Sequence, residues 1–107
     1  MDSLPRITGA TVDVLEALLA SRDQWGLLII KETGRPPGTV YPILDRLESA
    51  GWVTSAWESS SERPGPRRRF YALTADGRAA AVDASRKFRA KASPSARTAP
   101  RPVGLGT

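Results

Sequence analysis

The chain contains no cysteine and no histidine. Disulfide bonds are therefore impossible, and a zinc or haem-type metal site would have to rest on carboxylates alone, which is not a usual ligand set. Nucleophilic sites of the Ser-His or Cys-His kind are excluded for the same reason. Paired carboxylates and a Gly-rich phosphate loop are also missing. We expect no cofactor and no enzymatic activity.

Long apolar runs are absent too. No run approaches the roughly 20 residues that a membrane-spanning helix needs, and the opening MDSLPRITG lacks the basic start and apolar centre of a signal peptide. We therefore expect a soluble cytoplasmic protein without membrane contact. Three Trp, two Tyr and two Phe in 107 residues leave the core to Leu, Ile, Val and Ala, and this length suits one small domain.

Acidic residues are missing from one stretch, residues 63–75, which holds four arginines: Arg63, Arg67, Arg68 and Arg69. The chain as a whole is divided in the same way. Residues 1–62 hold five Lys/Arg and nine Asp/Glu, a net charge of −4, whereas residues 63–107 hold eleven Lys/Arg and two Asp, a net charge of +9. Such a division indicates an anionic partner for the second half. A solvated basic tail is the alternative.

Apolar spacing predicts three helices in the first half. The first follows Gly9 and ends near residue 21. The second covers residues 24–33, with Asp23 as N-cap and Gly34 just after its end. The third covers residues 37–50, because Pro37 suits the first position of a helix and Pro42 is tolerated only near the first turn.

A hairpin and a fourth helix follow. Residues 52–58 and 67–73 have β character, and the Ser/Gly/Pro-rich residues 59–66 join them. Thr74 caps a helix over residues 75–91. We expect one domain over residues 1–92 with this helix used for dimerisation, and a basic, Pro/Gly-rich, disordered tail over residues 93–107.

This order predicts a mainly α fold with a small β-hairpin, the winged helix-turn-helix (α-α-α-β-β-α). In that fold the third helix enters the major groove of DNA and the hairpin wing contacts backbone or minor groove.

Several linked motifs in this order resemble the PadR family of bacterial transcriptional regulators. They are GLLIIK after Trp25, PPGTVYPILDRLESAGWVTSAWE, and GPRRRFYALTADGRAA. The match covers roughly residues 10–80. The sequence departs from the family in two places: Pro36 stands where the family commonly has a serine that caps the third helix, and the C-terminal helical region is reduced to about one helix.

The resemblance implies a DNA-binding, repressor-type regulator that acts as a homodimer on a palindromic operator. Family members often respond to small aromatic or drug-like ligands, so an effector of that kind is also implied. A winged-helix module that binds another protein, as an antirepressor or adaptor, is the alternative, and the acidic residues 1–62 favour it somewhat.

The predicted DNA contacts begin with the third helix and the turn before it: Lys31, Arg35, Gly38, Thr39, Tyr41, Pro42 and Arg46. Five of these residues also have a simpler role. Thr39 can be a local cap, Tyr41 can pack on the second helix, and Arg46 can pair with Glu32 or another surface acid. Lys31 and Arg35 can face solvent.

The wing supplies the remaining predicted contacts, Arg63, Arg67 and Arg68, through phosphates. Strand alternation places Arg69 on the face opposite Arg68, where it can cover Trp57 or pair with Glu58. We expect Trp57 and Trp52 in the hairpin core, and Trp25 in the core rather than at a dimer surface.

Dimer contacts are expected from the first and last helices, through Val12, Leu19, Val82 and Phe88. The basic residues of the last helix either add nonspecific affinity for DNA or are solvated: Arg86, Lys87, Arg89 and Lys91.

Overall fold

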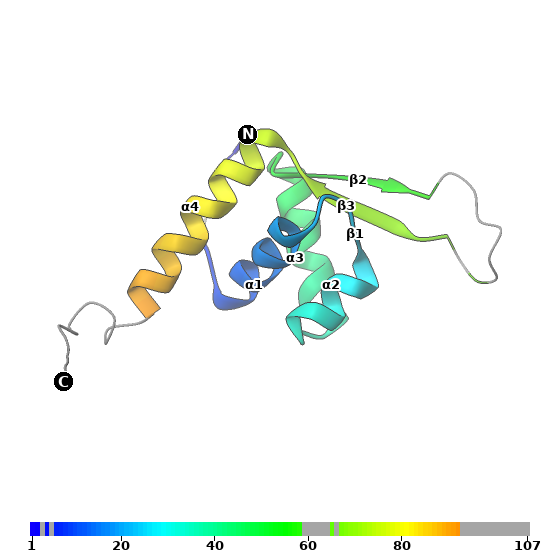
Figure 1. Cartoon of the computed structure of the whole chain (residues 1–107), viewed down its shortest axis with the longest axis horizontal. Helices are drawn as coiled ribbons and strands as arrows, with labels where there is room; N and C mark the ends of the chain where they lie inside the picture. Colours follow the sequence, from blue (N-terminus) through cyan, green and yellow to red (C-terminus); the bar gives the residue numbers. More distant parts are fainter. Residues whose placement is uncertain (3, 5, 59–64, 66, 93–107) are drawn as a thin grey trace.

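The computed structural model describes residues 1, 2, 4, 6–58, 65 and 67–92. Its elements follow in the order α1 (Gly9–Ala20), β1 (Gln24–Trp25), α2 (Gly26–Thr33), α3 (Pro37–Ser49), β2 (Val53–Trp57), β3 (Arg69–Leu73) and α4 (Ala75–Ala92). Figure 1 shows the helices gathered at one end and the β2–β3 hairpin, called the wing below, extending away from them. The predicted tail, residues 93–107, lies outside the described residues, and its disorder stays a prediction.

Local signals set the ends of the helices. Thr8 accepts the amide of Thr11 at the start of α1, and Thr74 accepts the amide of Gly77 at the start of α4, as predicted. Gly34 ends α2 in the left-handed region at φ 71°, a conformation that glycine adopts without a steric cost. At the start of α3, Pro36 provides no side-chain hydrogen bond.

The sheet has one strand more than the sequence predicted. β1 pairs with β3, which lies between β1 and β2, and both pairings are antiparallel. Gln24 and Trp25 therefore belong to a strand and not to the second helix, so the prediction of Asp23 as its N-cap was wrong. The side-chain amide of Gln24 donates a hydrogen bond to the backbone carbonyl of Ala17 at 3.0 Å, which attaches this short strand to α1.

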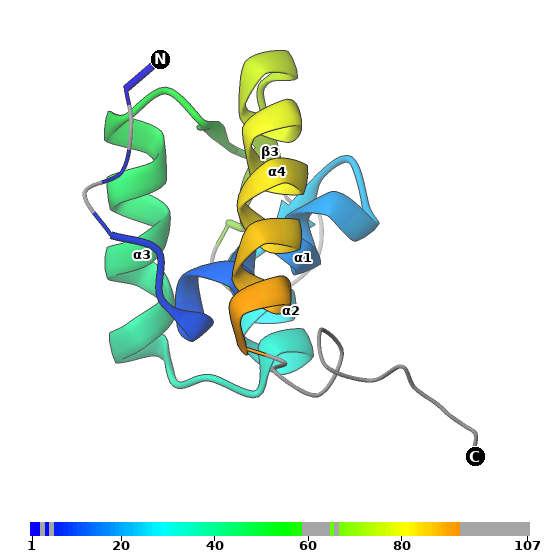
Figure 2. The ribbon, with the colours of Figure 1, turned by 90° about the vertical axis from the view of Figure 1, so that its left-hand side faces the viewer.

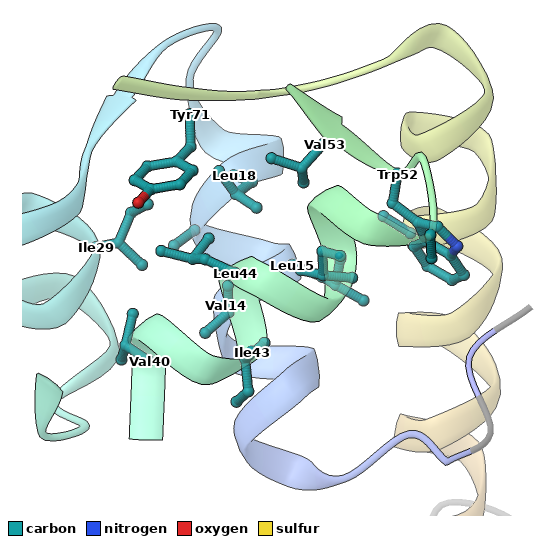
Figure 3. Packing of buried hydrophobic residues seen from close by; sticks show 14 residues of the cluster. Val14, Leu15, Leu18, Ile29, Val40, Ile43, Leu44, Trp52, Val53 and Tyr71 are labelled. Carbon is teal, nitrogen blue, oxygen red and sulfur yellow. The ribbon is translucent and has the colours of Figure 1, made fainter. Parts of the chain in front are cut away.

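The core lies between the three N-terminal helices and one face of the sheet. Leu15, Leu18, Ile29 and Leu44 are fully buried. Figure 3 shows Leu18, Ile29 and Leu44 near Tyr71 of β3, and Leu15 farther along the core toward Trp52. Burial raises the pKa of the Tyr71 phenol above its ordinary value. The apolar stripes of α1 and α3 face this core, whereas Leu28 of α2 is exposed.

The N-terminal segment packs along α3, as Figure 2 shows. The Asp2 amide donates to the Ala50 carbonyl at 2.8 Å, and the indole of Trp52 donates to the Asp2 carbonyl at 2.7 Å. Trp52 is therefore in the core, as predicted. Three helices, a wing and a fourth helix confirm the winged-helix class.

Candidate nucleic-acid interface

The outer surface of α3 is the first part of the candidate site. Gly38, Pro42, Asp45 and Ser49 are exposed along it, because their helical spacing places them opposite the buried stripe of Val40, Ile43, Leu44 and Leu47. This strip of small and polar side chains leaves the helix free to approach another surface closely.

The first turn of α3 offers few free amides. The amides of Thr39 and Val40 both donate to the carbonyl of Pro36, at 2.9 and 3.0 Å, and Pro37 has no N–H. Thr39 is half-buried and Gly38 exposed. Gly38 is therefore the position where the backbone of this turn is best placed to meet a phosphate.

Tyr41 packs on the second helix, which is the simpler role considered for it. A Cβ added to Gly26 would lie 3.0 Å from both Cε1 and Oη of Tyr41. The ring still keeps 37% of its surface exposed. Gly26 thus allows Tyr41 to lie flat against α2 while one edge of the ring faces outward, so packing and DNA contact are compatible.

Arg46 lies at the other flank of α3, beside the N-terminal segment. It is exposed and lines a small cavity of about 190 Å³ together with Leu4, Arg6 and Thr8. Arg6 was not predicted as a site residue, since only the packing of the N-terminal segment brings it to α3. Two cations therefore lie on this flank.

The two cations that flank the turn differ. Lys31 is exposed in the last turn of α2. Arg35, however, is tied to α1, because its guanidinium lies 3.0 Å from the carboxylate of Asp13. The expectation that Arg35 faces either phosphate or bulk solvent omitted this ion pair.

The arginines of the wing separate into different roles. Arg67 is exposed. Arg68 lies with its guanidinium 4.0 Å from the ring centroid of Trp25, and its Nε is buried without a hydrogen-bond partner. Arg68 is thus drawn onto the sheet, and Trp25 is half-buried beneath it. Arg63 lies outside the described residues.

Arg69 connects the wing to α3. Its guanidinium donates to Ser55 Oγ at 2.7 Å and lies 3.7 Å from the Glu48 carboxylate, while Ser55 Oγ donates to Glu48 at 2.6 Å. The cation also lies 5.0 Å from the ring centroid of Trp57. Arg69 therefore covers Trp57, as one prediction had it, and the acid it reaches is Glu48.

Trp57 is exposed over 58% of its surface, so its prediction as a core residue was wrong. Strand alternation places Trp57 on the same face of the hairpin as the buried Val53. It does not show that the wing extends past the helices at this point, so that no helix covers Trp57. The sequence signal for this was the absence of any further large apolar residue opposite it in the hairpin.

The predicted dimer residues are not equally available. Val12 is fully buried within the protomer and has no surface to offer a partner in this conformation. Leu19 and Phe88 are half-buried, and Val82 keeps 45% of its surface exposed. The burial of Val12 argues against a dimer contact at this position.

Ion pairs fasten α4 to α1. Arg89 contacts Asp13 at 3.3 Å and Glu16 at 2.7 Å, while Arg86 and Lys87 pair with Asp83 on α4 itself. Hydrogen bonds from Arg89 and then Ser85 hold the pKa of the Glu16 carboxyl below its ordinary value. Arg86, Lys87 and Arg89 in the second half of α4 therefore have acidic partners, and Lys91 is exposed.

A cavity of about 820 Å³ lies between α4 and the N-terminal segment. Leu4, Ile7, Trp52 and Phe88 provide apolar walls, and Lys87 is at its edge. Phe88 and Arg35 both approach Gly9, since a Cβ on Gly9 would lie 3.6 Å from each of these side chains.

A family model of PadR-like transcriptional regulators matches residues 14–83. The chain belongs to this family. The match includes most of the interface described above, from α1 through the wing to the first half of α4, and it confirms the resemblance seen in the sequence. Comparison with curated protein sequences gives no match.

Solved structures of winged-helix regulators share this fold. Reduced AbfR bound to DNA is 27% identical, with a TM-score of 0.60 over 76% of this chain and 56% of AbfR. PcaV, a transcriptional regulator from Streptomyces coelicolor, is 19% identical, with a TM-score of 0.71 over 87% of this chain and 66% of PcaV. BpsR from Bordetella bronchiseptica, whose DNA binding is regulated by 6-hydroxynicotinic acid, is 22% identical, with a TM-score of 0.65 over 82% of this chain and 66% of BpsR.

The chain thus spans a little over half of AbfR and about two thirds of PcaV and BpsR. Within the described parts of the chain, no helix has the length and apolar character needed to cross a membrane.

Proposed function

We propose that this PadR-family chain is a sequence-specific DNA-binding repressor that acts as a homodimer on a palindromic operator. α3 enters the major groove, and the wing lies on the flanking backbone. Residues 1–92 form the binding domain, and the basic residues 93–107 add affinity that does not depend on sequence.

The observation that carries this proposal is the outer strip of α3. Its exposed residues are small or short, with Tyr41 on one flank and Arg46 on the other. The short outer side chains allow the backbone of this helix to lie close to the base edges in a groove about 12 Å wide. Arg46 supplies the long side chain that reaches a guanine edge or a phosphate. Thr39 and Lys31 contact the sugar-phosphate backbone of the DNA.

The wing supports the same orientation. Arg67 is exposed, and residues 63–75 contain no acid that would oppose phosphate. Arg68 is held on Trp25, so we assign to Arg67 the phosphate contact that the sequence divided between them.

Dimerisation uses α4 and the adjoining side of α1. Val82 is the exposed apolar residue of α4, and Leu19 and Phe88 add partly exposed apolar surface. We propose that these three residues, without Val12, contact the second protomer.

The cavity beside α4 is the site we propose for an effector. Its apolar walls suit a small aromatic ligand, and Lys91, beyond the Asp83–Lys87 ion pair, supplies a cation for an acid group of that ligand. A ligand there would press on Phe88, which borders the Arg35 side of α1, and so would loosen the protein from the operator.

The test is a titration of duplex DNA of random sequence at increasing salt, followed by fluorescence anisotropy. Because phosphate contacts release counterions, we expect the affinity to fall by about 10³-fold or more between roughly 50 and 200 mM salt. The variant R46A/R67A should bind more weakly and with a shallower salt dependence. An affinity unaffected by salt or by this variant would overturn the proposal.

A second function, docking onto another protein, is favoured by two exposed leucines. Leu27 and Leu28 of α2 keep 51% and 41% of their surfaces exposed, and they lie within the acidic residues 1–62. If this surface serves a protein partner, L27S/L28S should abolish regulation in cells while DNA affinity stays at the wild-type value. Unchanged regulation in L27S/L28S would remove this second candidate.

A further inference from the structure

Trp57 is a large aromatic side chain that the fold leaves in the open. It stands at the outer end of β2 with 58% of its surface exposed, whereas Trp52 keeps 5%. An indole loses considerable apolar contact with water when it meets a partner, so its position on the wing is informative.

The sheet register places Trp57 on the side of the wing that faces α3. Trp57 pairs with Arg69, Ser55 with Tyr71, and Val53 with Leu73. Because Val53 and Tyr71 are in the core and side chains alternate along a strand, Trp57 continues the core face beyond the helices. Figure 1 shows that this part of the wing extends past the helical body.

A chain of contacts holds the indole in place. Glu48 of α3 accepts from Ser55 at 2.6 Å, Ser55 accepts from Arg69 at 2.7 Å, and the Arg69 guanidinium lies 5.0 Å from the Trp57 ring centroid. The ring is therefore fixed relative to α3 rather than free to rotate over the wing. Such preorganisation reduces the entropy lost on binding.

The surroundings of the ring favour DNA over an apolar protein surface. Arg69 lies over the ring, and the exposed Arg67 lies two residues before it in the sequence, just ahead of β3. Residues 63–75 contain no acid. An aromatic ring near an exposed cation suits the deoxyribose and base edges of a groove whose phosphates Arg67 contacts.

We propose that Trp57 packs against the sugar and base edges of the groove that flanks the one entered by α3, and that Glu48, Ser55 and Arg69 position it there. This inference rests on the proposed DNA binding. Trp57 would give the wing an uncharged contact with DNA, in addition to the phosphate contact proposed for Arg67.

The test compares W57A with wild type on one duplex over a range of salt. We expect the dissociation constant of W57A to rise about tenfold while the slope of log affinity against log salt stays unchanged, because the indole carries no charge. T54A is the matched control, since Thr54 is exposed on the opposite face of the same strand, and it should bind like wild type.

The positioning role is tested by S55A, which removes the hydroxyl between Glu48 and Arg69 and leaves every charge in place. It should weaken binding in the wild-type background but not in the W57A background, because Ser55 acts through the ring. An equal loss in both backgrounds would show that this chain of contacts does not position Trp57.

Three results separate the possible failures. If wild type does not bind duplex DNA at all, the proposed function fails. If wild type binds and W57A binds equally well, only the inference about Trp57 is overturned. Acrylamide quenching provides a second measurement: DNA should protect tryptophan emission in wild type and not in W57F, and equal protection in both would also overturn the inference.

Discussion

Asp13 and Arg35 form an ion pair at 3.0 Å that joins α1 to the turn before α3. The same carboxylate contacts Arg89 of α4 at 3.3 Å. One acid thus lies between the helix proposed for dimerisation and the start of the helix proposed to read DNA. It also draws the Arg35 guanidinium away from a phosphate.

Substitution D13N should release Arg35. We expect a twofold to fivefold gain in affinity for any duplex, roughly the strength of a partly exposed ion pair, and a salt slope steeper by about one. The free energy of unfolding should fall by about 1 kcal/mol, because the ion pairs of Asp13 with Arg35 and Arg89 are lost. E16Q is the matched control, since Glu16 pairs with Arg89 but not with Arg35. The same affinity in D13N and E16Q would contradict this role.

Gly38 allows stability and binding to be separated. A Cβ there would meet nothing within 4 Å, so G38A should stabilise the fold by roughly 0.5–1 kcal/mol through helix propensity. DNA affinity should fall at the same time, because the added methyl group keeps phosphate from the backbone. Thermal unfolding and anisotropy measure the two effects, and unchanged affinity would argue against contact at this turn.

Gly77 is essential for a different reason. A Cβ at this position would lie 2.0 Å from the carbonyl oxygen of Trp52, which is backbone and cannot rotate away. We expect G77A to lose more than about 4 kcal/mol of stability or to fail to fold, as measured by urea denaturation. G38A is the paired control, and a mild effect of G77A would show that α4 can move from the sheet.

Removal of Arg67 should affect DNA binding, whereas removal of Arg68 should affect stability. R67A should weaken binding to all duplexes and reduce the salt slope by about one, with little change in stability. R68A should instead lower the melting temperature, because it uncovers Trp25 and removes a cation–π contact of about 1 kcal/mol or more. Equal salt slopes in wild type and R67A would exclude a phosphate contact at Arg67.

Local sequence signals were enough for most of the fold. Gly34 and Thr74 mark helix ends through their own backbone and hydroxyl chemistry, and the stripe of α3 follows from helical spacing. The strand at Gln24 and Trp25 could not be predicted, because its partners, Phe70 and Tyr71, are distant in sequence.

The DNA-binding site was harder to predict, because the partners of its side chains are also distant in the sequence. Arg68, Arg69 and Arg67 look alike in the sequence, yet Trp25 engages the first, Ser55 and Glu48 engage the second, and the third remains exposed. The partner of Arg35 is on another helix. Spacing gives the face of a side chain, whereas its partner depends on how the elements pack.

The central claim is that α3 and the wing read an operator as a homodimer. Selection of bound sequences from a random duplex pool tests it most directly. The account predicts a palindromic consensus with half-sites about one helical turn apart, and loss of preference at one position of each half-site in R46A. Recovery of no consensus, or of a single half-site that R46A reads as wild type does, would contradict it.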